Sequence, residues 1–254
     1  MRGLKGKRVI ITGSGSGIGR EIARRFAEEG AEVAVFDVNE DGAAETVSLI
    51  EANGGRATSY IVNITDRAAI DAAVKLVESS GPVDILVNNA GWDKIVSFLD
   101  SDVDLWKKVI DINLYGPLHM HHAVLPGMVK NGGGRVINIS SDAARVGSSG
   151  EAVYSSCKGG IISFTKTVAR ELARSGIQLN VVCPGPTDTP LFAEIAGGEE
   201  GGSKIAESLK RAIPMRRLAQ PADFPGIVCF LGSDDAGFIT GQTISVSGGL
   251  TMHG

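Results

Sequence analysis

The stretch Thr12–Gly19, TGSGSGIG, lies between an apolar run (KRVIITG, residues 7–13) and a helix-like run (GIGREIARRFAEEG, residues 17–30). Glycines let a backbone pass close to a pyrophosphate, and the N-terminus of the following helix offers free N–H groups and a partial positive charge. The spacing fits T-G-x-x-x-G-x-G rather than the commoner G-x-G-x-x-G. A tight strand–helix turn is the alternative, but the position after a first strand favours a dinucleotide-binding loop made by Gly13, Ser14, Ser16, Gly17, Ile18 and Gly19.

Short β-branched runs alternate with longer helix-like stretches along the rest of the chain. The runs predict seven strands, at residues 7–13, 31–38, 57–64, 83–89, 134–140, 177–185 and 243–249. They are apolar on both faces, which is typical of a parallel sheet covered by helices on each side. The sequence therefore predicts an α/β fold with a doubly wound, Rossmann-like parallel seven-stranded sheet.

No linker or repeat divides the chain, so residues 1–254 are expected to form a single dinucleotide-binding and catalytic domain. One shift in composition, AGGEEGG at 196–202, indicates the hinge of a mobile substrate lid over about residues 190–217. A long helical stretch is expected from about Asp102 to Lys130.

Composition excludes several classes of partner. The 25 basic and 29 acidic residues give a net charge of −4, which would attract neither nucleic acid nor an anionic membrane. The three cysteines have no metal-ligand spacing and favour a reducing compartment. The N-terminus lacks a signal-peptide pattern, and no run of apolar residues is long enough to span a membrane. We expect a cytoplasmic protein that acts on a small molecule.

Asp37 closes the second predicted strand, eighteen residues beyond Gly19. An acid at this point accepts hydrogen bonds from the adenosine ribose hydroxyls and repels a 2′-phosphate. Positions 14, 16, 38 and 39 hold no Arg or Lys that would neutralise such a phosphate. These residues predict NAD as the cofactor in preference to NADP, with a turn-forming role for Asp37 as the alternative.

A second stretch, SDAARVGSSGEAVYSSCKGG (141–160), places Lys158 four residues after Tyr154. This spacing puts both side chains on one helix face, about 5–6 Å apart at Cβ. An ammonium at about 5 Å favours the phenolate by roughly 3 kcal/mol, or about two pKa units, which brings tyrosine into the range of a general acid/base. Ser141 ends the fifth strand, where its hydroxyl can bind a substrate oxygen. The alternative is a core tyrosine beside a solvated lysine.

These residues, together with NNAG (88–91), Asn113 and CPGPTDTP (183–190), resemble the short-chain dehydrogenase/reductase family over essentially the whole chain. The resemblance implies that Tyr154 is the acid/base and that Ser141 orients the substrate. It also implies that Lys158 binds the nicotinamide ribose and lowers the tyrosine pKa. Asn113 would hold a water that links Lys158 to solvent.

The same resemblance implies the NAD site. Residues 89–91 would line the adenosine ribose and 184–189 would cover the nicotinamide. Asn63 stands where the family usually has an aspartate, and its amide carbonyl could still accept from the adenine amino group. The cofactor residues expected beyond the glycine loop and Asp37 are Val38, Asn63, Ile64, Asn89, Ala90, Gly91, Tyr154, Lys158, Pro184, Gly185, Thr187 and Thr189. The family also implies a homotetramer.

Longer strings, such as NNAGWD (88–93) and GSDDAGFITGQ (232–242), are similar to 2-hydroxycyclohexanecarboxyl-CoA dehydrogenases. This narrower resemblance implies hydride transfer between NAD and a secondary alcohol on a β-hydroxyacyl-CoA with an alicyclic ring. The alternatives are a 3-oxoacyl-[acyl-carrier-protein] reductase, a dehydrogenase of a polyol, steroid or cyclic alcohol, and a cofactor-binding regulator without turnover. Expected substrate contacts are Trp92, Asp142 and Arg145.

Two further groups of side chains have a competing, purely structural interpretation. Cations of the lid segment are candidates for the phosphates of a CoA handle, with a solvated helix face as the alternative: Lys204, Lys210, Arg211, Arg216 and Arg217. In HMHH, His119 and His122 share a helix face but have no acid or cysteine at ligand spacing. Packing or interface contacts are therefore expected for the histidines, and no metal site is predicted.

Overall fold

The computed structural model describes residues 1–195 and 198–252, and its strands form one parallel sheet in the order β3-β2-β1-β4-β5-β6-β7. The strands are β1 (Arg8–Thr12), β2 (Glu32–Asp37), β3 (Arg56–Ile61), β4 (Ile85–Asn88), β5 (Gly134–Ile139), β6 (Ile177–Pro184) and β7 (Thr243–Val246). All seven predicted strands are confirmed, and so is the doubly wound, single-domain α/β fold.

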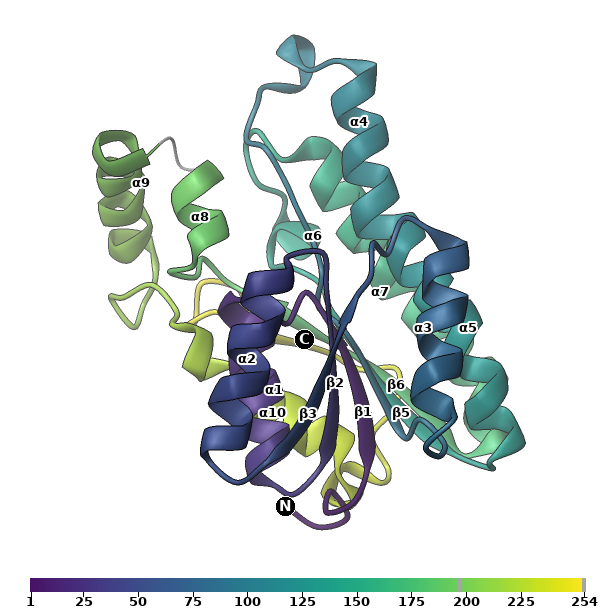
Figure 1. The fold of residues 1–254 in the computed structure, drawn as a ribbon. Helices are drawn as coiled ribbons and strands as arrows, with labels where there is room; N and C mark the ends of the chain where they lie inside the picture. Colours follow the sequence, from purple (N-terminus) through teal and green to yellow (C-terminus); the bar gives the residue numbers. More distant parts are fainter. Residues whose placement is uncertain (196–197, 253–254) are drawn as a thin grey trace.

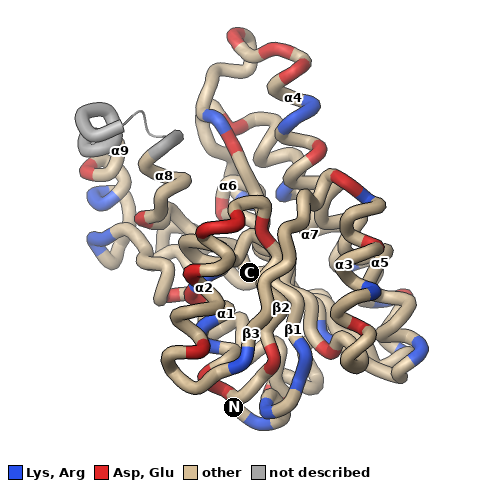
Figure 2. Tube along the Cα trace, viewed as in Figure 1, with Lys and Arg blue, Asp and Glu red and all other residues tan. Residues whose placement is uncertain are grey.

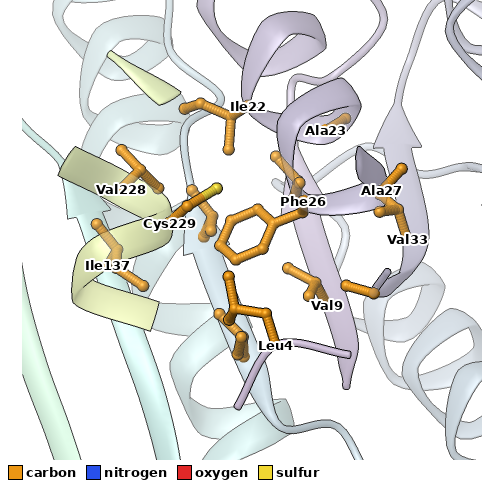
Figure 3. Packing of buried hydrophobic residues seen from close by; sticks show 14 of the residues in the cluster. Leu4, Val9, Ile22, Ala23, Phe26, Ala27, Val33, Ile137, Val228 and Cys229 are labelled. Carbon is orange, nitrogen blue, oxygen red and sulfur yellow. The ribbon is translucent and has the colours of Figure 1, made fainter. Parts of the chain in front are cut away.

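Helices cover both faces of the sheet, because the central strands have apolar side chains on both faces. On β1, Val9 and Ile11 pack in a cluster with α1 (Gly17–Glu28) and α10 (Pro225–Gly232), whereas Ile10 packs on the opposite face. Side chains along a strand alternate between faces, so a continuous apolar run must be covered twice. Figure 3 shows the first cluster, in which Phe26 of α1 lies beside Val9 and Cys229.

The remaining helices follow the same two layers (Figure 1). α2 (Glu40–Ala52) lies with α1 and α10, while α3 (Arg67–Glu78), α5 (Gly116–Lys130) and α7 (Ala152–Leu172) pack on the other face. The helix α3 begins at Asp66, whose carboxylate accepts from the N–H groups of Ala68 and Ala69. The other α-helices are α4 (Val103–Ile110), α6 (Ala143–Val146), α8 (Pro190–Ile195) and α9 (Gly198–Ala212).

The edge strand β3 differs from the prediction that every strand is apolar on both faces. Its sequence RATSYI contains polar residues, and most of its side chains are exposed. It pairs only with β2, and Tyr60 packs on Phe36 with the ring centroids 5.3 Å apart. An edge strand has one neighbour and less cover, so the rule for central strands does not extend to it.

The helical stretch expected over 102–130 is confirmed, since the chain is helical without a break from Val103 to Lys130, with one π-helical turn inside the stretch. Asp102 caps α4 by accepting from Leu105 N at 2.8 Å, and a π-turn over Asp111–Tyr115 joins α4 to α5. A π-turn inserts an extra residue in the helical ladder and is often found at a functional site. Asn113 lies in the middle of this turn.

The segment expected to be a lid forms α8 and α9, which project from the body of the molecule in Figure 1. Of the expected hinge, Ala196 and Gly197 lie outside the described residues, as does the side chain of Lys204. Figure 2 shows acidic and basic residues interspersed along the helices. None of the helices within the described part of the chain has the length and apolar character needed to cross a bilayer.

Candidate active site

The predicted site segments meet at the carboxyl edge of the sheet. β1 pairs with β2 on one side and with β4 on the other, so the chain reverses its winding direction at β1. Ligands of doubly wound sheets bind outside the carboxyl ends of the strands at such a point. The glycine loop follows β1, the NNAG segment follows β4, Ser141 follows β5 and residues 185–189 follow β6.

The glycines of the loop after β1 are required by close backbone approaches. A Cβ atom on Gly13 would lie 2.7 Å from Ala90 Cα, and one on Gly19 would lie 2.1 Å from the Gly13 carbonyl oxygen. Asn89 Nδ2 donates to the same Gly13 oxygen at 2.9 Å, which joins the loop to the NNAG segment. Gly17 faces the Thr189 methyl group at 3.6 Å from its ideal Cβ position. The loop therefore forms one wall of the site and the segment after β6 lies opposite.

The two loop serines differ in availability. Ser16 is exposed at the start of α1 and makes no side-chain capping bond, so its hydroxyl and the N–H groups of Gly17 and Ile18 suit a pyrophosphate. Ser14 is buried and donates its hydroxyl proton to Ile11 O at 2.7 Å. The one hydroxyl proton of Ser14 is therefore used inside the loop, so Ser14 shapes the loop while Ser16 presents its hydroxyl.

Asp37 has the turn-forming role considered as the alternative, and this role leaves acceptor positions free. Its carboxylate accepts from Gly15 N at 2.7 Å and from Asn39 N at 2.9 Å, so it ties the glycine loop to the start of α2. Each carboxylate oxygen keeps a further acceptor position, which is what ribose hydroxyls require. Val38 beside it is 65% exposed and offers no charge. The residues at this end fit an unphosphorylated ribose.

Asn63 does not present its carbonyl oxygen toward the site as expected. That oxygen accepts from both the N–H and the hydroxyl of Thr65, at 3.0 and 2.9 Å. The amide therefore closes a turn before α3, and both of its lone pairs are used. Ile64 is buried and packs against the start of α5, since a Cβ on Gly116 would lie 2.5 Å from its Cδ1 atom.

Tyr154 and Lys158 lie near the start of α7, as the sequence predicted. The Lys158 Nζ atom is 5.6 Å from the centre of the Tyr154 ring, and the phenol is hydrogen-bonded with the Ser141 side chain. Lys158 is 4% exposed and donates to Ile139 O at 3.1 Å, while Ser140 Oγ donates to Lys158 O at 2.9 Å. The end of β5 thus fixes the lysine beside the tyrosine.

Asn113 reaches the same place from the π-turn. Its Nδ2 donates to Trp92 O at 2.6 Å and to Val109 O at 2.9 Å, and its Oδ1 accepts from Trp92 N. An ideal Cβ on Gly91 would lie 2.9 Å from Asn113 Oδ1 and 3.3 Å from Lys158 Nζ. The glycine of NNAG therefore lies between the amide of Asn113 and the ammonium of Lys158. Lys158 in turn lies beside Tyr154, which bonds with Ser141, so the four residues expected to be catalytic form one connected group.

The ionisation of this group differs from the expectation. Burial, followed by the negative charges of Glu151 and Asp93, raises the pKa of Tyr154, and the hydrogen bond with Ser141 opposes this only in part. Burial also lowers the pKa of Lys158 to about 8. The prediction that Lys158 depresses the tyrosine pKa left out desolvation and the two acids, and in this structure those effects are larger.

Asp93 and Glu151 were not identified from the sequence. They line a pocket with Tyr154, Phe98, Trp106 and Val109. Burial, and to a smaller degree the nearby Glu151, raises the pKa of Asp93 to about 7. In the sequence, Asp93 stands directly after NNAGW, and this nearness to the NNAG segment is the one local sign that it lies at the site. Glu151 has no comparable sign.

The residues expected to contact substrate lie near the site but have protein partners. The ammonium of Lys108 lies over the Trp92 ring, 3.6 Å from the ring centre, in a cation–π contact. Trp92 is not among the residues that line the pocket beside Tyr154. Asp142 is buried and accepts from Ser245 Oγ of β7, which in turn accepts from Arg145 at 2.8 Å. These bonds connect the loop after β5 to β7.

The segment after β6 is also built by internal bonds. Gly185 N donates to Val246 O at 3.0 Å, Asp142 N donates to Pro184 O at 2.9 Å, and Thr187 Oγ1 donates to Gly185 O at 2.8 Å. Thr189 accepts from Phe192 N and so begins α8. These bonds hold Pro184, Gly185, Thr187 and Thr189 at the carboxyl end of β6, with Thr189 facing Gly17 of the glycine loop.

Most of the described cations of the lid segment are partnered. Lys210 pairs with Glu207 at 2.8 Å, and Arg217 forms a two-point pair with Asp223 at 2.6 and 2.8 Å. Arg216 donates to Arg211 O, while the Arg211 side chain is exposed beside Glu207. Arg211 is therefore the better placed of these cations for an added anion.

The histidines of HMHH separate into packing and surface contacts. His121 is 1% exposed and lies in a buried polar network with Asn138, Asn88 and Thr165. Its Nδ1 contacts Pro117 O at 2.6 Å, and burial lowers its pKa to about 4. His119 stacks on Tyr115 and His122 contacts Arg67. The sequence did not predict this network.

Comparison with known proteins agrees with the geometry. The family model adh_short_C2, described as enoyl-(acyl carrier protein) reductase, matches residues 13–251. The chain is 35% identical over 250 residues to the 3-oxoacyl-[acyl-carrier-protein] reductase FabG of Thermotoga maritima, covering 98% of this chain and 99% of that one.

Two other relatives are similarly close. The (2S)-[(R)-hydroxy(phenyl)methyl]succinyl-CoA dehydrogenase subunit BbsD of Thauera aromatica is 37% identical over 251 residues, covering 98% of each chain. The uncharacterized oxidoreductase YxbG of Bacillus subtilis is 37% identical over 254 residues, covering 98% of this chain and 93% of that one. The family model matches nearly the whole of this chain, and the relatives are 35–37% identical over almost all of it. The chain therefore belongs to the short-chain dehydrogenase/reductase family of oxidoreductases.

Proposed function

We propose that the protein is an NAD-dependent dehydrogenase that oxidises a secondary alcohol reversibly, on a β-hydroxyacyl-CoA substrate of the 2-hydroxycyclohexanecarboxyl-CoA type. The observation that carries the proposal is one connected group near the carboxyl edge of the sheet: Asn113 and Lys158 flank Gly91, Lys158 lies beside Tyr154, and Tyr154 bonds with Ser141. A protein that only bound a nucleotide would have no need of a phenol and an ammonium at this place.

The residues present fit a dinucleotide. Gly13 and Gly19 leave room beside the backbone, Ser16 and the start of α1 suit the pyrophosphate, and Asp37 suits the ribose. When bound, the nicotinamide supplies hydride exchange and, in its oxidised form, a positive ring. Thr189, across from Gly17, would close the nicotinamide side.

The acid/base work is assigned to the chain's own side chains. During oxidation, Tyr154 takes the alcohol proton at its phenol oxygen while Ser141 holds the reacting oxygen by a hydrogen bond. Lys158 holds a positive charge near the phenol; it relays the proton by releasing one of its own toward the side where Asn113 lies as it takes one from the tyrosine side, so its charge is unchanged. In reduction the same proton moves in the opposite direction. A positive ring at the site would offset the two acids that raise the pKa of Tyr154.

The CoA handle is proposed on two grounds. The printed name of the BbsD relative describes a dehydrogenase of a hydroxylated acyl-CoA. In this chain, Arg211 is exposed on α9 at the projecting segment. We propose that α8 and α9 move as a lid and that Arg211 contacts a CoA phosphate.

The experiment for the handle compares KM for a hydroxyacyl-CoA thioester with KM for the free hydroxy acid. Arg211→Ala should raise KM for the thioester about tenfold and leave the free acid unchanged, because one charge-assisted contact is removed. Lys130→Ala, an exposed cation at the end of α5, is the matched control. Equal KM values in wild type and Arg211→Ala would refute the contact.

A second candidate, a 3-oxoacyl-[acyl-carrier-protein] reductase, is favoured by the FabG relative and by the family model. Asp37 argues against it if the reaction uses NADPH, since a carboxylate repels the 2′-phosphate. Dehydrogenases of a polyol, steroid or cyclic alcohol remain further alternatives. Assays with NAD, NADP, acyl-CoA and acyl-carrier substrates separate these activities.

The test of the class is NADH formation, followed by its absorbance, with a panel of secondary alcohols and hydroxyacyl-CoA thioesters. The proposal predicts turnover with NAD that exceeds turnover with NADP at least tenfold, on the order of one charged hydrogen bond. No turnover with any alcohol would favour a nucleotide-binding regulator instead. We also propose a homotetramer in the cytoplasm, which size-exclusion chromatography with light scattering can test in part by giving the oligomeric mass.

A further inference from the structure

Two acidic side chains meet beside Tyr154 in a position that the mechanism above does not use. Asp93, in the segment after β4, is 5% exposed, and Glu151 is the residue before α7. Their side chains are hydrogen-bonded to each other. A bond between two carboxyl groups requires that one of them carry a proton. We refer to Asp93 and Glu151 as the acid pair.

The backbone holds the acid pair in place. Val96 N donates to Gly150 O at 3.0 Å, so the segment after β4 and the loop before α7 run side by side. Gly150 has a φ of +84°, and a Cβ there would lie 2.7 Å from Ile95 Cγ2. Glycine is therefore needed for both the turn and the approach. The contact between the acids follows from the way these two segments are joined.

The surroundings of the acid pair make its charge effective at Tyr154. Both acids line the same pocket as Tyr154, together with the apolar side chains of Val96 and Val109. Asp93 Oδ2 is buried without a donor from the protein. Charges act more strongly in such poorly solvated places than in water.

Other charged and titratable groups also face this region. Lys158 attracts the Asp93 carboxylate, and the Lys94 backbone bonds to it. The buried thiols of Cys157 and Cys183 lie near Lys158, and Ser141 bonds with Tyr154. Burial raises the pKa of both thiols, so they are neutral at pH 7. Lys94 also lines the same pocket, so the charged groups to consider here are the acid pair, Lys94 and Lys158.

We propose that the acid pair controls, through its charge, the proton that Tyr154 holds, and thereby sets the pH at which the site oxidises an alcohol. Asp93 and Glu151 do not touch the reacting atoms; they act on Tyr154 through their negative charge. The inference rests on the acid/base role proposed for Tyr154. Burial, and to a smaller degree the nearby Glu151, raises the pKa of Asp93 to about 7, so the acid pair becomes more negative as the pH rises through that value. Each negative charge opposes ionisation of the phenol, so a doubly charged pair keeps Tyr154 as a proton donor for carbonyl reduction.

The direct test is the ultraviolet titration of tyrosinate, which needs no turnover. The chain has three tyrosines, so subtracting the titration of each protein's Tyr154→Phe version isolates Tyr154. Asp93→Asn and Glu151→Gln should each lower its midpoint by about one pH unit, and the double variant should lower it further. Glu171→Gln, an exposed acid on the same helix, should leave it unchanged.

An unchanged midpoint in the folded single variants would overturn the proposal. Loss of stability or of kcat without a moved midpoint would show that the pair is only structural, which also overturns it. If Asp93→Asn does not fold, Glu151→Gln alone decides, since that residue is only half-buried.

A kinetic arm separates this inference from the proposed function. The acidic limb of the pH profile of kcat/KM for alcohol oxidation should move down by about the same one unit in Glu151→Gln. A moved tyrosinate midpoint in a protein without any dehydrogenase activity would support charge control and contradict the function. Dehydrogenase activity with an unmoved midpoint would do the reverse.

Discussion

Gly91 has no room for a side chain, because a Cβ atom would lie 2.9 Å from Asn113 Oδ1 and 3.3 Å from Lys158 Nζ. Gly91→Ala should therefore displace the ammonium or the amide and lower kcat about ten- to hundredfold, in line with the effect of small misplacements at catalytic groups. Gly226→Ala is the control, since its added methyl group meets nothing within 4 Å. Steady-state kinetics with a hydroxyacyl-CoA checks this, and a fully active Gly91→Ala would show that the approach is not needed.

Asp37 is the residue on which the cofactor preference depends. Replacing it by Asn removes the charge that repels a 2′-phosphate and weakens the bonds with ribose, so kcat/KM with NAD should fall about tenfold while the NADP/NAD ratio rises. The neighbouring exposed Asp41→Asn serves as the matched control. An unchanged ratio in Asp37→Asn would assign Asp37 to the turn alone, where it already binds Gly15 and Asn39.

At the scale of the element, the π-turn between α4 and α5 carries Asn113 to the site. Asn113 is fully buried, and its amide makes three bonds with the backbone of Trp92 and Val109. Asn113→Ala should lower the free energy of unfolding by about 2 kcal/mol, because buried backbone groups lose their partners. It should also lower kcat.

Urea unfolding measures this change. Asn131→Ala, at the exposed end of α5, is the control that should cost much less. Equal stability of Asn113→Ala and wild type would mean that the turn forms without the amide, and the placement of Asn113 would then need another cause.

For the whole molecule, His121 makes stability depend on pH. Burial depresses its pKa from 6.5 to about 4, so the unfolded chain binds a proton that the folded chain does not over that interval. Its contribution is fully present above pH 6.5 and is lost as the pH falls toward 4, by about 3 kcal/mol in total. His121→Gln should therefore lose less stability than wild type between pH 7 and pH 4.5.

The comparison between variants is needed because Asp93 acts in the opposite direction. Its pKa is raised to about 7, so its contribution decreases as the pH rises toward 7. This effect cancels in the difference between wild type and His121→Gln. His122→Gln, on the exposed side of α5, should show the wild-type dependence, and identical pH dependence in His121→Gln would contradict the assignment.

Much of the fold could be predicted because central strands of a covered parallel sheet are apolar on both faces, as Val9, Ile10 and Ile11 show. The glycine loop and the Tyr154–Lys158 spacing are local patterns, so they could also be predicted from the sequence. The exposure of the edge strand β3 and the π-turn were missed, since strand cover and an inserted helical residue depend on tertiary packing.

Details of the site that depend on contacts distant in sequence could not be predicted. Asp93 and Glu151 meet only because Val96 pairs with Gly150, and His121 meets Asn138 only through the packing of α5 on the sheet. Ser14 and Asn63 have suitable chemistry for a cofactor, but their bonds to Ile11 and Thr65 became visible only in the fold. The raised pKa of Tyr154 has the same origin, because burial has no local sequence signal.

The central claim is that the phenol of Tyr154 exchanges the substrate proton. The most direct measurement compares wild type with Tyr154→Phe for NADH formation from NAD and a hydroxyacyl-CoA, with NADH affinity measured on the same samples. We predict that Tyr154→Phe loses at least a thousandfold in kcat, within the range of general acid/base effects of roughly 10²–10⁴, while the dissociation constant of NADH changes less than about threefold. Retained turnover in Tyr154→Phe would contradict the account.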